Sequence, residues 1–353
     1  MGFFPKDRDL TETPEEVLIE VDGSFFQEKA AGFLMRLDHF LAAHLTWRSR
    51  TSIQALVRDG YVFLDAATPD HPQGTGVRKV ERRPGRRVGQ GTKVIVVIPE
   101  DLRLPVYDGN AQPLDILYEG GGVIAVNKPA NVAVHPSGRH HTDTLIQRVH
   151  AHFKDEIQSL GEAPRLGHRL DRETSGVVLV GKGQADHREL RRQFEAHLVD
   201  KTYLAVVWGN PEQDDGSIRF PIAPSTASHI RLKMAVRGDG VEARTDFVVR
   251  ERMGNYALLE CRLFTGRQHQ IRLHLSAIGY PIVGDKLYGP DDEMFIHAAE
   301  RRLTEADYAL LELPRQALHH HRIAFNSPGD GERVVVQSPL AADLQAFVES
   351  KMG

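Results

Sequence analysis

An acidic side chain lies between two basic ones in the stretch HRLDRETSG, residues 168–176. Asp171 is flanked by Arg169 and Arg172, at the end of one apolar segment and just before another. A cation within about 4–6 Å favours the ionised form of a carboxylate, which makes it a poor proton donor. Such a group is suited to act as a nucleophile or to stabilise positive charge at a sugar carbon. A structural Arg–Asp pair at a turn fits the same residues, so both interpretations stay open.

A second group of polar residues surrounds the predicted helix at 269–279. Arg267 and Arg272 bracket the start of this helix, where backbone N–H groups and arginines together suit a phosphate or a carboxylate. A helix with exposed cations is the simpler interpretation. It is weakened by the glycines and aromatic residues around this one element, which are Gly266, Gly284, Gly289, Tyr280 and Tyr288.

Tyr203 and Lys128 are candidates with weaker local support. Tyr203 lies in the predicted strand KTYLAVVWG (201–209), where alternation with Leu204 also fits a core-facing aromatic side chain. Lys128 lies in VNKPANVAVHP (126–136), beside a proline, where a loop lysine is usually solvated. The local sequence therefore assigns neither residue to a site.

Two histidine tracts, His140–His141 and His319–His321, suggest a metal site at first sight. In a strand only alternate residues share a face, so at most His319 and His321 point the same way. No carboxylate or cysteine pair stands at ligand spacing from either tract. The sequence therefore predicts no metal site.

The elements that must position these residues point to an α+β fold. Strands outnumber helices and do not alternate regularly with them, which favours a mixed, largely antiparallel sheet over a doubly wound one. The sequence predicts strands at 116–136 (a hairpin), 175–182, 201–209, 243–253, 256–264 and 317–325. It predicts helices at 143–153, 184–199, 269–279 and 340–352.

The residues before this part form a small α/β unit of their own. Its predicted elements are helices at 32–45 and 49–60 and strands at 61–64 and 93–99, with a weaker strand at 17–26. Residues 100–113 have the composition of a linker. The predicted division is an N-terminal extension at 1–31, a small domain at 32–99 with a basic insertion at 66–90, the linker, and a large domain at 114–353.

Positive charge is concentrated in the small domain, although the whole chain has a net charge of −4. Residues 34–99 contain eleven Lys and Arg against five Asp and Glu, whereas residues 1–33 contain three against eight. Such a basic segment is either a surface for phosphate or a solvated surface. Charge alone leaves both possibilities open.

Composition also bounds the setting of the protein. The single cysteine, Cys261, excludes an intramolecular disulfide and fits a reducing compartment. The first twenty residues are acidic after their start and lack the apolar core of a secretory signal. No run approaches the roughly 18 apolar residues of a membrane helix. We therefore expect a cytoplasmic protein without a membrane partner.

Four separated segments resemble the motifs of RluA-type RNA pseudouridine synthases. They are VNKPANVAVHP, HRLDRETSGVVLVGK, KTYLAVVWG and TGRQHQIRLHLSAIGYPIVGDKLYG, in the order of the family, and the resemblance spans about 114–340. It implies the fold of that family, an α+β domain with flanking helices around a central cleft. It also implies isomerisation of uridine to pseudouridine within RNA by base flipping, without a cofactor.

The resemblance implies roles for four residues. Asp171 matches the catalytic aspartate, which either attacks the anomeric carbon or removes a proton from the neighbouring sugar carbon. Arg169 matches the residue that fills the space left by the flipped nucleotide. Tyr203 matches the tyrosine that stacks on the target base and takes part in a proton step, and Arg272 matches the arginine that pairs with the aspartate.

Residues 36–64, RLDHFLAAHLTWRSRTSIQALVRDGYVFL, resemble the alpha-L RNA-binding domain, the type found in ribosomal protein S-four. The chain departs from that domain in two places. The insertion at 66–90 makes either an extra RNA contact or a loop that touches nothing, and VFLDAA replaces the usual V-x-V-N-G. The predicted RNA-binding residues are Arg36, Arg48, Arg50, Arg58, Lys128 and Arg267.

The expected partner is RNA. Family members with this small domain often modify large-subunit ribosomal RNA, so ribosomal RNA is the expected substrate by analogy, and transfer RNA stays open. A monomer is the default expectation. The alternative function is a non-catalytic RNA-binding or ribosome-assembly factor on the same scaffold, whose cellular role would survive the substitution Asp171→Asn.

Overall fold

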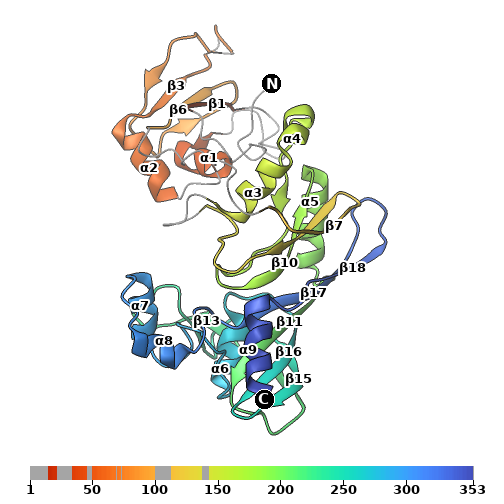
Figure 1. The fold of residues 1–353 in the computed structure, drawn as a ribbon. Coiled ribbons are helices and arrows are strands. Elements are labelled where there is room, and N and C mark those ends of the chain that lie inside the picture. Colours follow the sequence, from red (N-terminus) through yellow and green to blue (C-terminus); the bar gives the residue numbers. More distant parts are fainter. Residues whose placement is uncertain are drawn as a thin grey trace. The chain divides into compact units, whose positions relative to one another are not determined.

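Figure 1 shows the computed structural model of the chain, whose contacts divide it into two compact units. The first unit comprises residues 1–112 and 135–164, and the second comprises 113–134 and 165–353. The structure describes residues 15–21, 34–45, 50–68, 70–72, 74–99, 113–136 and 143–352. None of the helices in these ranges is long and apolar enough to cross a membrane.

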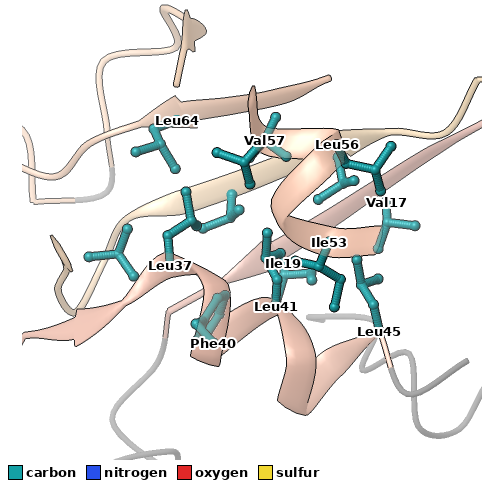
Figure 2. Packing of buried hydrophobic residues seen from close by; sticks show 14 of the residues in the cluster. Val17, Ile19, Leu37, Phe40, Leu41, Leu45, Ile53, Leu56, Val57 and Leu64 are labelled. Atoms are coloured by element: carbon teal, nitrogen blue, oxygen red, sulfur yellow. The ribbon is translucent and has the colours of Figure 1, made fainter. Parts of the chain in front are cut away.

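The first unit contains a four-stranded antiparallel sheet with the order β1-β6-β3-β4. Its strands are β1 (Glu16–Glu20), β3 (Val62–Asp65), β4 (Lys79–Val80) and β6 (Lys93–Val97), and a second ladder joins β2 (Met35–Arg36) to β5 (Arg87–Val88). The helices are α1 (Leu37–His44) and α2 (Arg50–Asp59), as predicted. Figure 2 shows β1, both helices and β3 contributing to one apolar core, with Val17, Leu41, Ile53 and Leu64 among its members.

The small sheet begins earlier than the predicted domain boundary at residue 32. β1 pairs along its whole length with β6, and Val17 and Ile19 are buried while Leu18 is exposed. Residues 16–20 are therefore part of the folded unit and not of an extension. Two inward side chains within an acidic segment give only a weak alternation, which explains the misplaced boundary. Residues 100–112 of the predicted linker lie outside the described residues.

The segment 66–90 is folded onto the same unit. β4 pairs with β3 and β5 pairs with β2, so the expectation of a loop that touches nothing is wrong. Asp65, the last residue of β3, accepts hydrogen bonds from the backbone N–H groups of Thr75 and Gly76 at 2.7 and 3.0 Å. A buried carboxylate thereby fixes the path of the segment.

Helices α3 (Leu145–His152) and α4 (Lys154–Leu160) belong to the first unit by their contacts. The sequence predicts one helix at 143–153 and assigns it to the large domain. Thr144 and Gln147 form a capping box at the start of α3, and Gly161 ends α4 in the left-handed conformation. An amphipathic helix carries no sign of the unit against which it packs, so the sequence could not reveal this grouping.

The second unit is built on a ten-stranded sheet with the order β12-β15-β16-β11-β17-β10-β8-β7, in which β18 pairs β17 and β9 pairs β10. The strands are β7 (Ile116–Gly120), β8 (Val123–Lys128), β9 (Arg165–Leu166), β10 (Ser175–Gly181), β11 (Asp200–Trp208), β12 (Asp215–Ile218), β15 (Thr245–Met253), β16 (Tyr256–Leu263), β17 (Leu318–Asn326) and β18 (Arg333–Gln337). The helices are α5 (Gln184–Glu195), α6 (Gln270–Ala277), α7 (Glu293–Ala299), α8 (Glu305–Leu311) and α9 (Ala342–Met352). A separate ladder joins β13 (Ile222–Pro224) to β14 (Met234–Val236). The predicted α+β class with a mixed, largely antiparallel sheet is confirmed.

Strands β10 and β17 run parallel, in contrast to the antiparallel pairs on either side of them. Their N-terminal ends lie at the same edge of the sheet, so the loops that precede them are neighbours. Gly176 of β10 has a φ of 109°, and a Cβ at this residue would lie 2.3 Å from the carbonyl oxygen of His320. Glycine is therefore required where the two strands meet. The loop before β10 contains Asp171, and the loop before β17 contains Gln316.

Candidate active site

Asp171 lies in a tight turn between β9 and β10. The backbone N–H of Thr174 donates to the carbonyl of Asp171 at 3.1 Å, and the side-chain amide of Gln316 donates to the hydroxyl of Thr174 at 2.7 Å. The ammonium of Lys128, at the end of β8, donates to the carbonyl of Arg172 at 2.9 Å. The turn is thus tied to the end of β8 and to the loop before β17, which fixes the position of the carboxylate.

Arg272 of α6 joins two carboxylates. Its Nη1 donates to Oδ2 of Asp171 at 2.8 Å, while Nε and Nη2 donate to the two oxygens of Asp285 at 2.6 and 2.8 Å. Asp285 is 1% exposed and also accepts hydrogen bonds from the backbone N–H groups of Leu287 and Tyr288. The bidentate pair with Asp285 fixes the plane of the guanidinium, which aims its remaining edge at Asp171.

This cluster of charges keeps Asp171 ionised. Burial by itself disfavours the charged carboxylate, but Arg272, with further contributions from His269 and Gln316, holds the pKa of Asp171 below its usual value. The same balance holds the pKa of Asp285 below its usual value. Asp171 nevertheless keeps 34% of its side chain exposed. An ionised and accessible carboxylate suits a nucleophile or a base and does not suit a proton donor.

The buried side chain of Gln270 shapes the start of α6. Its Oε1 accepts hydrogen bonds from the hydroxyl of Thr265 at 2.7 Å and from the backbone N–H of Arg267 at 3.0 Å. The preceding residue, His269, adopts the left-handed conformation with a φ of 56°, which is uncommon for a residue with a Cβ. The imidazole Nε2 of His269 lies 3.9 Å from Oδ1 of Asp171. The first turn of α6 therefore supplies two of the groups around the carboxylate.

Tyr203 of β11 is buried and stacks on His320 of β17. The two ring centroids lie 4.3 Å apart and the ring planes differ by 13°. A register shift between Thr202 and Tyr203 places this pair opposite each other in the ladder. Burial, reinforced by the negative charge of Asp171, raises the pKa of Tyr203 well above its usual value. A neutral aromatic ring therefore accompanies the ionised carboxylate.

Sequence reasoning does not identify Asp285, His269 or Gln316 as site residues. Asp285 carries one available signal, its place directly after a tight-turn glycine within a matched motif. A Cβ at that glycine, Gly284, would lie 2.1 Å from the carbonyl oxygen of Arg315, so the turn has no room for a side chain at this position. His269 and Gln316 carry no comparable signal, because polar residues are ordinary at helix starts and in loops.

The predicted RNA contacts of the second unit differ in accessibility. Lys128 is 0% exposed, and its ammonium donates to three backbone carbonyls at 2.8, 2.9 and 2.9 Å. An ammonium has three N–H groups and all three are used here, so the structure does not support an RNA contact by Lys128, which stays a prediction to be tested. Arg267 is exposed, and its Nε donates to the carbonyl of Glu242 at 3.1 Å. Arg169 is exposed, and its side chain makes no hydrogen bond or ion pair with the described residues.

In the first unit, one buried acid organises two of the predicted RNA contacts. Asp38 of α1 is 0% exposed and accepts hydrogen bonds from Arg36 at 3.0 and 3.1 Å and from Arg50 at 3.0 and 3.3 Å. The side chains of Arg36 and Arg50 remain 49% and 51% exposed. Arg58 is exposed as well. Arg48 lies outside the described residues.

The strand histidines are held by hydrogen bonds. His320 donates from Nδ1 to the carbonyl of Val177 at 2.6 Å, and Nδ1 of His319 is 2.9 Å from the hydroxyl of Ser175. In the part of the chain that the structure describes, no group of three or more His, Cys, Asp and Glu side chains could hold a metal ion. The tract His140–His141 falls outside that part.

Comparisons with known proteins agree with this geometry. The family model described as RNA pseudouridylate synthase matches residues 122–277, a span that contains Asp171, Tyr203 and Arg272. The uncharacterized RNA pseudouridine synthase YlyB of Bacillus subtilis is 36% identical over 89% of this chain and 93% of its own length. Ribosomal large subunit pseudouridine synthase D of Zymomonas mobilis is 32% identical over 90% of this chain and 94% of its own length.

A solved structure shows the same fold. Human RNA Pseudouridylate Synthase Domain Containing 4 superimposes with a TM-score of 0.54 at 22% identity, over 67% of this chain and 92% of that chain. Three findings agree on the family of this chain. They are the identities over most of its length, the match to the family model and the shared fold. The chain belongs to the RNA pseudouridine synthase family.

Proposed function

We propose that this RNA pseudouridine synthase isomerises specific uridines of ribosomal RNA, with Asp171 as the reacting group. One observation carries the proposal, the ionised carboxylate of Asp171 held by Arg272, which Asp285 orients in turn. The name of the Zymomonas mobilis relative, a ribosomal large subunit pseudouridine synthase, supports the choice of ribosomal RNA. Transfer RNA is the competing substrate, and the experiment below separates the two.

In the proposed reaction, the bond from the anomeric carbon to N1 of uracil breaks, the base turns, and the same carbon bonds to C5. The hydrogen on C5 leaves as a proton and N1 gains a proton, so the step consumes no oxidant or reductant. Asp171 either attacks the anomeric carbon to give an ester, or removes the proton of the neighbouring carbon to give a glycal. Both routes require an ionised carboxylate, which Arg272 favours.

The target base must leave its stack before this chemistry, at a cost of a few kcal/mol. We propose that Arg169, exposed beside the Asp171 turn, occupies the space that the nucleotide leaves. Tyr203 would stack on the flipped base with the ring face that His320 does not cover. Stacking of a base on an aromatic ring is worth about 1–3 kcal/mol, which offsets part of the cost.

The first unit is proposed to bind RNA in the manner of an alpha-L domain. The exposed side chains of Arg36 and Arg50 support this role. The ladder between β2 and β5 sets Arg87 of the 66–90 segment opposite Arg36, which adds a cation beside α1. Arginines that contact phosphate displace counterions, so this binding should weaken steeply with salt.

Pseudouridine mapping tests the proposal. Total RNA from a deletion strain, complemented with the wild type or with Asp171→Asn, is treated with carbodiimide and read by reverse transcription. We expect specific stops in ribosomal RNA that vanish on deletion and return with the wild type alone. Asn has the shape of Asp without its charge, so the purified variant should still bind the RNA.

Each other result removes a defined part of the proposal. Stops that return with Asp171→Asn would show that Asp171 is not the reacting group. Stops confined to transfer RNA would contradict the ribosomal substrate. If no stop depends on the protein, the catalytic proposal is wrong, and a binding or assembly factor becomes the better account.

A further inference from the structure

The carboxylate of Asp171 and the imidazole of His269 face each other at a distance that leaves room for one hydrogen-bonding atom between them. Oδ2 of Asp171 accepts a hydrogen bond from Arg272 at 2.8 Å and is approached by the amide of Gln316 at 3.5 Å. Oδ1 faces Nε2 of His269 at 3.9 Å. That separation exceeds the roughly 2.7–3.2 Å between the nitrogen and the oxygen of a hydrogen bond. Asp171 and His269 are therefore neighbours without being partners.

A chain of hydrogen bonds determines which nitrogen of His269 carries the proton. The backbone N–H of Met234 donates to the hydroxyl oxygen of Tyr288 at 2.9 Å. Nδ1 of His269 lies 3.0 Å from the same hydroxyl, and we assign it as the acceptor of the Tyr288 proton. Nδ1 is then an acceptor, so the proton of the neutral imidazole lies on Nε2, the nitrogen that faces Asp171.

The imidazole is neutral under working conditions. Burial is the main cause that lowers the pKa of His269 to about 4, and the charge of Arg272 adds to it, while Asp171 and Asp285 oppose the shift. Only 8% of the side chain is exposed. His269 also has the left-handed backbone noted above, and backbone strain of this kind is concentrated at functional sites.

The pair formed by Oδ1 of Asp171 and Nε2–H of His269 has the pattern of a hydroxyl-binding site. One oxygen can bond to both atoms, because two hydrogen bonds of about 2.8 Å each span a separation of 3.9 Å with a bend between them. That oxygen must donate to the carboxylate and accept from the imidazole. A hydroxyl does both.

The chemistry of RNA indicates which hydroxyl this is. Within an RNA chain, O3′ and O5′ belong to phosphodiesters and O4′ belongs to the ring, so the ribose has one hydroxyl, on C2′. That carbon is bonded to the anomeric carbon at which Asp171 is proposed to act. We propose that His269 and Asp171 together hold the 2′-hydroxyl of the target ribose, and that His269 thereby makes the site select ribose over deoxyribose. This inference rests on the proposed function.

The test compares two substrates and three proteins. The substrates are synthetic RNA oligonucleotides around a mapped target, one with uridine and one with 2′-deoxyuridine at that single position. The proteins are the wild type, His269→Asn and His269→Gln. The amide of Gln reaches the position of Nε2, whereas that of Asn reaches only the position of Nδ1. Asn tolerates the left-handed backbone better than Gln does. Backbone strain therefore ranks the Asn variant above the Gln variant, whereas hydrogen bonding to the hydroxyl ranks the Gln variant above the Asn variant.

We expect the wild type to prefer the ribose substrate by about 10-fold or more in kcat/KM, the size expected for hydrogen bonds that involve a charged group. His269→Asn should lose most of this preference, and His269→Gln should keep most of it. The intrinsic difference in reactivity between the two sugars cancels, because the same two substrates are used for each protein. Tyr288→Phe, which removes the donor to Nδ1, should reduce the preference in part.

A purely structural role of His269 gives a different result. The Asn variant would then lose activity equally on both substrates, and an unchanged ratio would overturn the inference. If the Asn variant does not fold, as judged by thermal unfolding, the ratio for Tyr288→Phe decides it, because a reduced ribose preference supports the inference and an unchanged one overturns it. A wild type inactive on a mapped ribose substrate contradicts the proposed function, whereas an active wild type with an invariant ratio contradicts only the role of His269.

Discussion

The two units of the molecule use arginine in opposite ways. In the second unit, Arg272 has 9% of its side chain exposed and spends its donors on Asp171 and Asp285. In the first unit, Arg36 and Arg50 share one buried carboxylate, that of Asp38, and stay about half exposed. The buried guanidinium favours the charge of a carboxylate, whereas the exposed ones stay accessible to solvent, as the proposed contact with phosphate requires. The number of acids around an arginine and its exposure, more than its neighbours in sequence, indicate its role.

Arg272→Gln should have the largest effect. Breaking a buried ion pair on one side costs about 3–5 kcal/mol of stability. Without the cation, burial dominates and raises the pKa of Asp171, so the carboxylate is protonated over a wider range as pH falls. We expect kcat/KM to fall by about 100-fold or more near neutral pH, with a greater loss at pH 6 than at pH 8. Rates measured across this range check the prediction.

Arg272→Lys is the matched control for this substitution. Lysine keeps the positive charge but loses the bidentate geometry toward Asp285, so its loss should be smaller and should depend less on pH. A loss in Arg272→Gln that is the same at pH 6 and pH 8 would mean that the arginine does not set the ionisation of Asp171.

Lys128→Met should have an intermediate effect, on stability and not on RNA affinity. The substitution removes three hydrogen bonds from a buried ammonium to backbone carbonyls. The free energy of unfolding in urea should fall by about 2–3 kcal/mol. The slope of log Kd against log salt should not change, because this ammonium has no N–H group left for phosphate. A slope reduced by about one unit would restore Lys128 to the RNA contacts.

Arg36→Gln and Arg50→Gln should have the smallest effects. Each should weaken RNA binding by a few-fold and reduce the salt slope by about one unit if the arginine contacts a phosphate. The kcat at saturating RNA should stay unchanged. Arg191→Gln on α5 is a matched control, since Arg191 is exposed and pairs with Glu195, and it should leave the salt slope as it is. Unchanged slopes for Arg36 and Arg50 would argue against the RNA-binding role of the first unit.

The sequence predicts long elements and misses short ones. The strands at 175–182 and 201–209 appear as β10 and β11, because seven or nine residues display the apolar pattern of a buried strand. Strands β9 and β13, of two and three residues, are too short to show any period. Their existence depends on the neighbours to which they pair, which a local pattern does not contain.

The residues of the active site likewise divide into those that the sequence predicts and those that it misses. Asp171 and Arg272 stand out because each lies in a segment of unusual charge. Asp285 and His269 matter because they contact those residues, and the bond from Arg272 to Asp171 alone spans 101 positions of sequence. The burial of Lys128 could not be predicted for a related reason. In the sequence it looks like a solvated loop cation, and only the three carbonyls around it show why it is buried.

The parallel pairing of β10 with β17 also affects when the protein becomes active. Ser175 and His319, which pair across these strands, are 144 positions apart, and contacts between distant residues form late in folding. At about 5–20 residues per second, ribosomes need roughly 7–30 s to extend the chain from Asp171 to Gln316. Until then the turn that carries Asp171 lacks one of its anchors. The nascent chain should therefore acquire catalytic activity only after the strand that follows Gln316 has been synthesised and has joined the sheet.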